Sequence, residues 1–396
     1  MEKIYLDYAA TTPVRPEVIK AMEPYWSEIF GNPSEPHGWG QQARVAIEES
    51  RNKIADFLGA KTQEIIFTSC ATESINLAHK GLVEAVGNRS SVAGKPHVIT
   101  SEIEHKAVLE TCRHLEKSGM AEVTYLPVDK YGLVKVKDLE KAIKSNTVLV
   151  SVMYVNNEVG TIEPIAEIGQ MIKVKSQKYG RKIYFHTDAT QGIQYLDCHV
   201  DKLGVDLLSF TGHKFYAPKG VGVLYVRDGV PLIRQQDGGG QERDLRSGTE
   251  NTPYIVGLGR AVELVGGEGK LRAIELTKLR DKLIKEILKR IPDSILTGSP
   301  DRRAPHIASF CFKGAEGEAI LLRLDAEGIA ASSGSACTSG SLRPSHVLLA
   351  MGIPPEVAHG SIRFSLGRKT TEEEIDYVLK VLPGVIDGIR KMAPKL

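Results

Sequence analysis

Short apolar runs alternate with helix-like segments over residues 64–227. The runs that predict β-strands are residues 65–68, 97–100, 123–126, 148–153, 183–186, 206–210 and 221–226. Several are apolar throughout, as in strands that helices cover on both faces, so the pattern predicts an α/β fold with a mostly parallel sheet. Only residues 211–220 join the last two runs. This is too short for a helical crossover, and we expect that pair to be antiparallel.

A cluster of glycines in residues 266–269 precedes a charged amphipathic stretch, residues 270–290. Further strands and helices are expected at residues 307–312, 318–324, 361–366 and 372–382. The glycines predict a bend or a boundary near residue 265. Because one hydrophobic core rarely extends beyond about 250 to 300 residues, a chain of 396 residues favours two domains, the second of them smaller.

Composition excludes several classes of partner. Lys and Arg number 51 against 49 Asp and Glu, without a long run of either sign, so neither nucleic acid nor a membrane surface is indicated. The apolar stretches are shorter than the ~20 residues of a membrane span, and residues 1–7 carry charge where a signal peptide is hydrophobic. The five scattered cysteines form no C-x-x-C pair, which argues against disulfides and structural zinc and favours a cytoplasmic protein.

Three polar segments follow predicted strands. Residues 209–214 (SFTGHK) bring the amine of Lys214 to the end of a strand, where we expect it on the sheet, although most lysines are solvated surface residues. Asp188 follows residues 183–186 and either caps a helix or, if a pyridine ring is bound, faces the ring nitrogen and keeps it protonated. Residues 68–74 (TSCATES) are either a simple helix cap or a phosphate turn built from backbone N–H groups and the Thr72 hydroxyl.

A fourth segment, residues 332–340 (SSGSACTSG), is polar and has no apolar periodicity. We expect its Cys337 to be an exposed thiol, whereas Cys112, Cys198 and Cys311 are expected to be buried and inert. The sequence contains neither a dinucleotide-binding G-x-G-x-x-G pattern nor a P-loop. Hydride transfer and ATP hydrolysis are therefore disfavoured.

These segments, in this order, resemble a cysteine desulfurase of the NifS/IscS class, in the class-V aminotransferase family. Further matching segments are residues 5–12, 31–33, 104–106, 155–160, 238–243, 246–249 and 366–368. The resemblance implies the PLP-dependent transferase fold of type I, which is aspartate-aminotransferase-like. Its large domain, with a mostly parallel mixed sheet, would span residues 13–262. A smaller α+β domain, residues 1–12 and 263–396, would carry the cysteine segment. Cys70 stands where glycine is common in this family.

The resemblance also implies pyridoxal 5'-phosphate (PLP) as the cofactor. Lys214 would form the internal aldimine, Asp188 would pair with the pyridinium nitrogen, and His105 would stack on the ring. The catalytic residues would be Lys214, Cys337 and His105. The other residues implied near the cofactor are Gln191 at the ring hydroxyl, Asn157, and, around the phosphate, Ala71, Thr72, Thr211 and His213. Thr249 would reach the phosphate of the neighbouring subunit, which implies a homodimer.

Asn32, Asn157 and Arg363 would meet the substrate. In residues 361–366, Ile362 and Phe364 share one face of the strand, so Arg363 projects from the other, and its forked guanidinium suits a carboxylate. Without the resemblance, Arg363 would be interpreted as a solvated strand arginine and His105 as a helix N-terminal histidine.

The activity implied by the resemblance is conversion of L-cysteine to L-alanine. Sulfur would pass to Cys337 as a persulfide, and then to an acceptor such as an iron–sulfur scaffold protein, for iron–sulfur cluster assembly or other sulfur-containing products. No resident metal is expected. The alternatives are a selenocysteine lyase or an aminotransferase on the same scaffold, and a non-catalytic scaffold in which Cys337 carries sulfur or is a transient iron–sulfur ligand.

Overall fold

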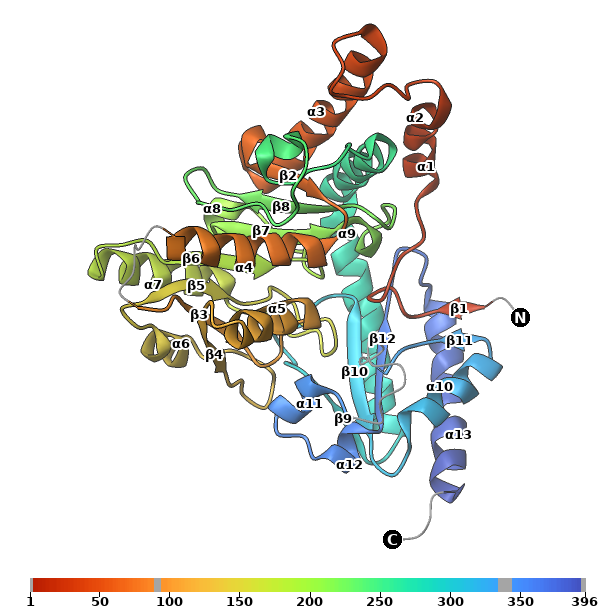
Figure 1. Ribbon diagram of the computed structural model, residues 1–396. Coiled ribbons are helices and arrows are strands. Elements are labelled where there is room, and N and C mark those ends of the chain that lie inside the picture. Colours follow the sequence, from red (N-terminus) through yellow and green to blue (C-terminus); the bar gives the residue numbers. More distant parts are fainter. Residues whose placement is uncertain (1–2, 89–93, 334–343, 393–396) are drawn as a thin grey trace.

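The computed structural model describes residues 3–88, 94–333 and 344–392. A seven-stranded sheet forms its larger part, in the order β2-β8-β7-β6-β5-β3-β4 (Figure 1). The strands are β2 (Ile65–Thr68), β3 (His97–Ser101), β4 (Glu122–Leu126), β5 (Thr147–Ser151), β6 (Tyr184–Asp188), β7 (Leu207–Thr211) and β8 (Gly222–Val226). All neighbours from β4 to β7 are parallel, whereas β8 is antiparallel to both β7 and β2. The predicted mostly parallel sheet and its antiparallel last pair are confirmed.

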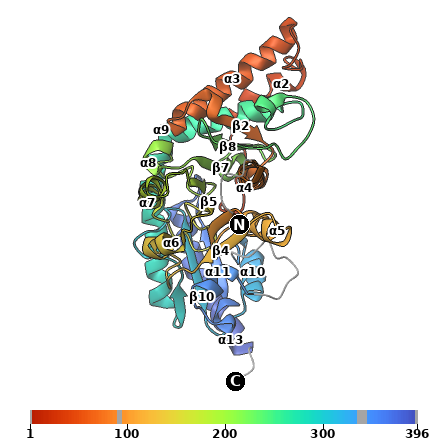
Figure 2. The ribbon, with the colours of Figure 1, turned by 60° about the vertical axis from the view of Figure 1, so that its left-hand side comes forward.

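Helices cover both faces of this sheet (Figure 2). Ile66 and Leu149 pack in a cluster with α4 (Ala71–Asn88) and α5 (Lys106–Lys117). Phe67 and Val150, the next residues along the same strands, pack on the opposite face with α3 (Gly38–Leu58), α7 (Ile165–Lys178) and the start of α9 (Thr252–Arg290). Burial on both faces is the reason that these strands are apolar throughout.

A smaller unit contains an antiparallel sheet of order β12-β10-β9 and a parallel pair of β1 with β11. Its strands are β1 (Ile4–Tyr5), β9 (Ser294–Leu296), β10 (Ile307–Phe312), β11 (Ile329–Ala330) and β12 (Ser361–Ser365). They share a core with α10 (Gly317–Ala326), α13 (Glu372–Met392) and the second half of α9. The remaining helices are α1 (Pro16–Met22), α2 (Pro24–Ser27), α6 (Val136–Ala142), α8 (Val200–Leu203), α11 (His346–Ala350) and α12 (Pro355–Ala358). Among the described helices, none combines the length and the apolar character that a membrane crossing requires.

The glycines near residue 265, where the sequence predicted a bend or a boundary, do not interrupt the helix, because α9 runs through them as one helix of 39 residues (Figure 1). Its apolar residues up to Val265 belong to the core of the large sheet, and those from Leu276 onward belong to the core of the smaller sheet. Close packing accounts for one of the glycines, since a Cβ at Gly269 would lie 2.6 Å from the carbonyl oxygen of Gln194. The division between residues 13–262 and the rest of the chain stays a prediction.

Candidate active site

Six strands of the large sheet, β2 to β7, run in the same direction, so their carboxyl ends meet at one edge. A cavity of about 340 Å³ lies at this edge, and Arg363 of β12 closes it from the smaller sheet. The predicted site residues that line it are Ala71, Thr72, His105, Asn157, Asp188, Gln191, Thr211, His213, Lys214 and Arg363. This is the part of an open α/β sheet that commonly holds ligands.

Lys214 lies one turn beyond β7, in a short 3₁₀ turn (Gly212–Lys214), and not on a strand as the sequence predicted. Its Nζ donates hydrogen bonds to the backbone oxygens of Ala9 (2.9 Å) and Ala10 (2.7 Å). These two residues also line the cavity. The turn lifts the amine away from the sheet hydrogen bonds and directs it into the cavity, against the N-terminal segment.

Asp188 is the last residue of β6 and is buried. Its Oδ1 accepts a hydrogen bond from the backbone N–H of Thr190 (2.9 Å), so it makes the local contact of a capping acid while lining the cavity. Gln191 is buried beside it and donates from Nε2 to the backbone oxygen of Ala9 (2.9 Å). Both side chains are therefore fixed by short contacts on the cavity wall.

The predicted phosphate turn (residues 68–74), called the phosphate turn below, connects β2 to the first turn of α4. Thr68 and Ser74 are joined through their hydroxyls (2.7 Å), and the Glu73 carboxylate accepts from the backbone N–H of Ser69 (2.7 Å). Burial disfavours the charged form of Glu73, but hydrogen bonds from Arg246 and Ser69 outweigh it and lower the pKa of this carboxyl. An acid thus stands in the turn with its charge balanced by Arg246.

His213 and His105 are both on the cavity wall. Burial, with the nearby charges of Lys214 and Lys219, lowers the pKa of His213 to about 4, so its ring is neutral at physiological pH. His105 is the N-cap of α5, and its Nδ1 accepts from the backbone N–H of Ala107 (3.1 Å). The capping interpretation of His105 is thus confirmed, and its presence at the cavity is compatible with the proposed ring contact.

Arg363 is 4% exposed, so it is not the solvated strand arginine of the simpler interpretation. Ile362 and Phe364 point into the core of the smaller unit, and Arg363 faces the cavity, as the alternation predicted. Its Nη1 donates to the backbone oxygen of Asn157 (2.6 Å) and its Nη2 to Oδ1 of Asp7 (2.8 Å). Its buried Nε has no hydrogen-bond partner in the described part of the chain.

Asn32 and Thr249 do not lie with the other predicted residues. Both are exposed, and neither lines the cavity. Asn32 accepts a hydrogen bond from the backbone N–H of Ser34 (3.0 Å) in the loop between α2 and α3, at the top of Figure 1. Within one chain these two side chains do not meet the cavity.

Cys337 lies outside the described residues. On one side of its segment, Ser332 pairs with the cavity-lining Arg363 through backbone hydrogen bonds. On the other side, Ser345 donates its hydroxyl to Glu158, the chain neighbour of the cavity-lining Asn157. Burial raises the pKa of Glu158 to about 7, although the hydrogen bond from Ser345 and the positive charge of Arg363 both act to lower it. Cys112, Cys198 and Cys311 are buried, as predicted, and burial raises the pKa of each thiol.

Sequence reasoning assigned no role to Asp7, Ala9, Ala10 or Glu158. Asp7 to Ala10 belong to residues 5–12, which match the family, so that match was the available signal for them. The signal for Glu158 was its place beside Asn157 in another matching segment, residues 155–160. Neither segment indicated which side chain each of these residues would contact.

Comparison with known proteins agrees with this geometry. Residues 4–378 match the model of the family described as Aminotransferase class-V. The chain is 52% identical to cysteine desulfurase IscS of Dictyoglomus turgidum, over 99% of this chain and 96% of that one. It is 46% identical to a cysteine desulfurase of Rattus norvegicus, over 100% of this chain and 85% of that one.

The chain belongs to the class-V aminotransferases, in the NifS/IscS class of cysteine desulfurases.

Solved structures place this NifS/IscS-class chain in the same fold. One described as a NifS-like protein superposes with a TM-score of 0.89 at 40% identity, over 98% of this chain and 100% of the other. Another, described as SspA in complex with cysteine, has a TM-score of 0.79 at 40% identity, over 92% and 98% of the two chains. The type I fold expected from the resemblance is thereby confirmed.

Proposed function

We propose that this chain is a PLP-dependent cysteine desulfurase, which converts L-cysteine to L-alanine and transfers the sulfur to Cys337 as a persulfide. The observation that carries the proposal is the convergence of Lys214, Asp188 and Arg363 on one cavity in a chain of the NifS/IscS class. These are an amine, a carboxylate and a guanidinium from three separate elements.

The residues of the cavity fit PLP. The volume of about 340 Å³ is in the range of small-molecule sites. Thr190 lines the cavity with a buried hydroxyl that lacks a partner among the described residues, and such a group needs a ligand or water. Lys214 would hold the cofactor through its amine, Asp188 would face the ring nitrogen, and Gln191 the ring hydroxyl. The phosphate would lie at the N-terminus of α4 against Ala71 and Thr72, with Thr211 and His213 beside it.

When bound, PLP supplies an electron sink for charge that develops on the substrate Cα. Arg363 would bind the substrate carboxylate, which exchanges for one of the present guanidinium contacts, with Asn157 beside it. Asn32 does not reach the cavity of its own chain, so it would have to meet the substrate in the other subunit of a dimer. Lys214 would carry the Cα proton, and His105 would orient the ring. The Cys337 thiolate would attack the substrate sulfur, so that the S–S bond of the persulfide forms as the C–S bond of cysteine breaks.

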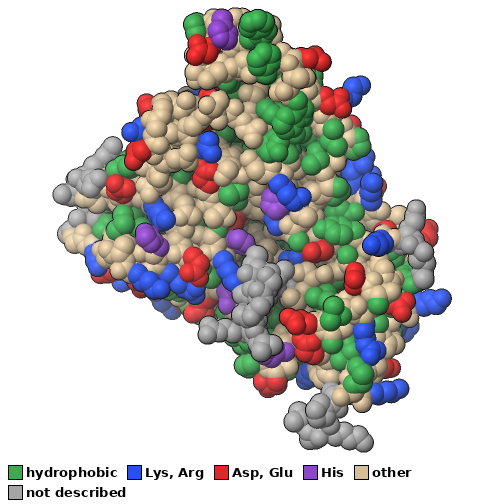
Figure 3. All heavy atoms as spheres, turned by 45° about the vertical axis from the view of Figure 1, so that its right-hand side comes forward, with side chains coloured by type: hydrophobic (Ala, Val, Ile, Leu, Met, Phe, Trp, Pro, Cys, Tyr) green, Lys and Arg blue, Asp and Glu red, His purple; other side chains and the backbone are tan. Residues whose placement is uncertain are grey.

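A homodimer would account for the exposed aromatic side chains of α2, α3 and the loop between them. Trp26, Phe30 and Trp39 are 57%, 66% and 60% exposed, and the rings of Phe30 and Trp39 stack at 6.3 Å. Figure 3 shows hydrophobic side chains gathered at the top of the molecule, where α2 and α3 lie in Figure 1. Large exposed apolar patches commonly mark protein interfaces. In the proposed dimer, Thr249 of each subunit would contact the phosphate in the other.

The persulfide would be delivered to an acceptor such as an iron–sulfur scaffold protein, for cluster assembly or other sulfur-containing products. We place the enzyme in the cytoplasm, where a reducing environment would keep its scattered cysteines as thiols. None of the described cysteines is in a disulfide.

Cys337→Ser tests the proposal, because it separates cofactor chemistry from sulfur transfer. A hydroxyl cannot replace a soft, readily ionised sulfur nucleophile. The variant should keep the visible absorbance of bound cofactor and respond spectrally to L-cysteine, yet form neither persulfide nor alanine at the wild-type rate. Mass spectrometry of the protein and amino-acid analysis measure both products. Alanine formation from cysteine at the wild-type rate would remove Cys337 from the reaction.

A further inference from the structure

The loop that carries Thr249 has a strained backbone. Within this Thr249 loop (residues 238–250), three successive residues, Glu242, Arg243 and Asp244, have positive φ angles of 45°, 57° and 63°. Residues other than glycine seldom adopt this left-handed conformation, because their Cβ then comes too close to the following carbonyl oxygen. Such a loop keeps its shape only when the surrounding structure holds it.

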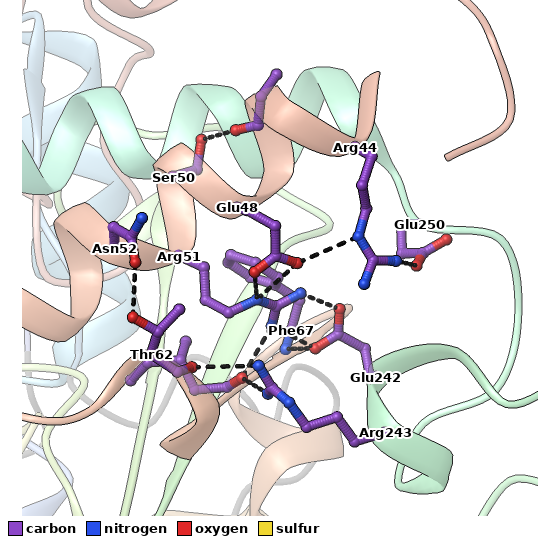
Figure 4. A network of polar contacts seen from close by, with 12 residues as sticks. Arg44, Glu48, Ser50, Arg51, Asn52, Thr62, Phe67, Glu242, Arg243 and Glu250 are labelled. Atoms are coloured by element: carbon purple, nitrogen blue, oxygen red, sulfur yellow. Dashed lines mark hydrogen bonds and ion pairs between the residues drawn. The ribbon is translucent and has the colours of Figure 1, made fainter. Parts of the chain in front are cut away.

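A buried ion pair holds the loop against the edge strand of the large sheet (Figure 4). Two nitrogens of Arg51, on α3, donate to the two oxygens of Glu242 at 2.8 and 2.9 Å, and the side chains are only 4% and 2% exposed. Glu242 also accepts from the backbone N–H of Phe67 (2.8 Å). The backbone oxygen of Ile65 accepts from Arg51 (2.8 Å) and from Arg243 (3.1 Å). The loop therefore satisfies the free edge of β2, the strand that leads into the phosphate turn.

A second ion pair connects the loop to the phosphate turn itself. Nε of Arg246 donates to Oε1 of Glu73 at 2.8 Å, and both side chains are about four-fifths buried, with 22% and 23% exposed. The other carboxylate oxygen of Glu73 accepts from the backbone N–H and the hydroxyl of Ser69. Glu73 thus closes the phosphate turn with one oxygen and binds the Thr249 loop with the other.

Thr249 is exposed between anchored neighbours. The N–H of Gly248 donates to the side chain of Gln241 (3.0 Å). The Glu250 carboxylate is 5% exposed and lies 4.0 Å from Nη1 of Arg44, as Figure 4 shows. Thr249 thus lies between a contact within the loop and a contact to α3, in a loop whose other residues attach it to β2 and to the phosphate turn.

We infer that Arg246 is a positioning residue that couples the two cofactor-phosphate sites of the homodimer, through its ion pair with Glu73. This inference rests on the proposed function, in which Thr249 reaches the phosphate of the other subunit. A phosphate bound at the N-terminus of α4 adds negative charge close to Glu73, so it strengthens the attraction of the turn for Arg246. The Thr249 loop is then held more firmly in the orientation that the neighbouring site requires. Coupling of this kind is reciprocal between the sites.

Heterodimers of the full-length chain test the inference. One chain carries Lys214→Ala, so that the visible absorbance of lysine-bound cofactor reports only the site of the other chain. Arg246→Gln is placed either on the Lys214→Ala chain, where it acts across the interface, or on the chain with the intact lysine, where it acts within its own site. The measurement is the rate at which the visible absorbance is lost when released cofactor is trapped.

Loss of one charge-assisted hydrogen bond corresponds to roughly a tenfold change. We therefore expect Arg246→Gln on the Lys214→Ala chain to speed release from the opposite site about tenfold. Adding Glu73→Gln to that chain should produce little further change, because the two substitutions break the same ion pair. Arg272→Gln is the matched control, since Arg272 pairs with the exposed Glu275 (2.7 Å) in the second half of α9, and its described ion pair involves neither the Thr249 loop nor the phosphate turn. It should leave release unchanged.

Two results overturn the coupling. One is cofactor release at the parental rate when Arg246→Gln is on the Lys214→Ala chain. The other is faster release only when Arg246→Gln is on the chain with the intact lysine. If Arg246→Gln prevents assembly, Arg246→Lys takes its place, because it keeps the charge but not the geometry of the contact, and the same two outcomes apply. A parental heterodimer without any visible cofactor absorbance would instead contradict the proposed function. The two failures are therefore distinguishable.

Discussion

Arg363→Lys should weaken binding of the substrate while leaving the protein folded. The guanidinium now uses two of its nitrogens, Nη1 on the Asn157 backbone oxygen (2.6 Å) and Nη2 on Asp7 (2.8 Å). A substrate carboxylate would need two donors in fixed relative positions: Nε, which has no described partner, and one of the Nη nitrogens once its present contact is exchanged. A lysine ammonium keeps the charge but cannot present two donors in a planar fork.

The structure sets the size of the effect. Arg363 is only 4% exposed, so the contact that the substitution removes is a buried, charge-assisted hydrogen bond between the guanidinium and the substrate carboxylate. Such a bond contributes about 1.5 to 3 kcal/mol. That range corresponds to roughly one to two decades in affinity. We expect the KM for L-cysteine to rise by this factor and kcat to change less, because Lys214 and Cys337 are untouched.

Initial rates of alanine formation over a range of L-cysteine concentrations separate KM from kcat, and a spectral titration measures substrate binding directly. Asp7→Asn is the companion variant, because it keeps an oxygen acceptor for Nη2 and should change KM less than Arg363→Lys does. Thermal unfolding of both variants checks the fold. An unchanged KM in Arg363→Lys, with the fold intact, would refute the assignment of Arg363 to the substrate carboxylate.

Three further variants test two cavity residues and one buried acid outside the cavity. Lys214→Ala should abolish alanine formation and the visible absorbance of lysine-bound cofactor, since the amine is lost; sulfide release at the wild-type rate would contradict this role. Asp188→Ala should lose cofactor faster on dialysis and nearly stop Cα proton exchange in deuterated water, because an unprotonated pyridine is a poor electron sink; unchanged exchange would exclude Asp188. Burial, together with the charge of Glu104, raises the pKa of Glu163 to about 8. Between pH 4.5 and 8, Glu163 therefore ionises in the unfolded chain but not in the folded protein, and its contribution to folding stability should fall as the pH rises. Glu163→Gln should make this decline smaller in chemical denaturation at pH 5 and pH 8, with the raised pKa values of Glu158 and Glu104 accounting for a remaining part. An equal decline in both proteins would exclude Glu163 as a source.

The sequence by itself determined the central sheet and most of the cavity-lining residues. Apolar runs such as that of β8 could be recognised because burial on both faces leaves no polar positions in the strand. Alternation within β12 placed Arg363 opposite Ile362 and Phe364 without any knowledge of the fold. The order of the matching segments supplied the remaining candidates, Lys214 and Asp188 among them.

Only the tertiary structure decided which side chains pair. Arg363 and Asp7 are 356 residues apart, Arg51 and Glu242 are 191 apart, and Arg246 and Glu73 are 173 apart. The continuity of α9 through its glycines likewise depended on the surfaces on which its two halves pack. Local pattern reports which face of an element is buried. Contacts between distant residues depend on the order of strands in the sheet and on the packing of one unit against the other, which periodicity does not encode.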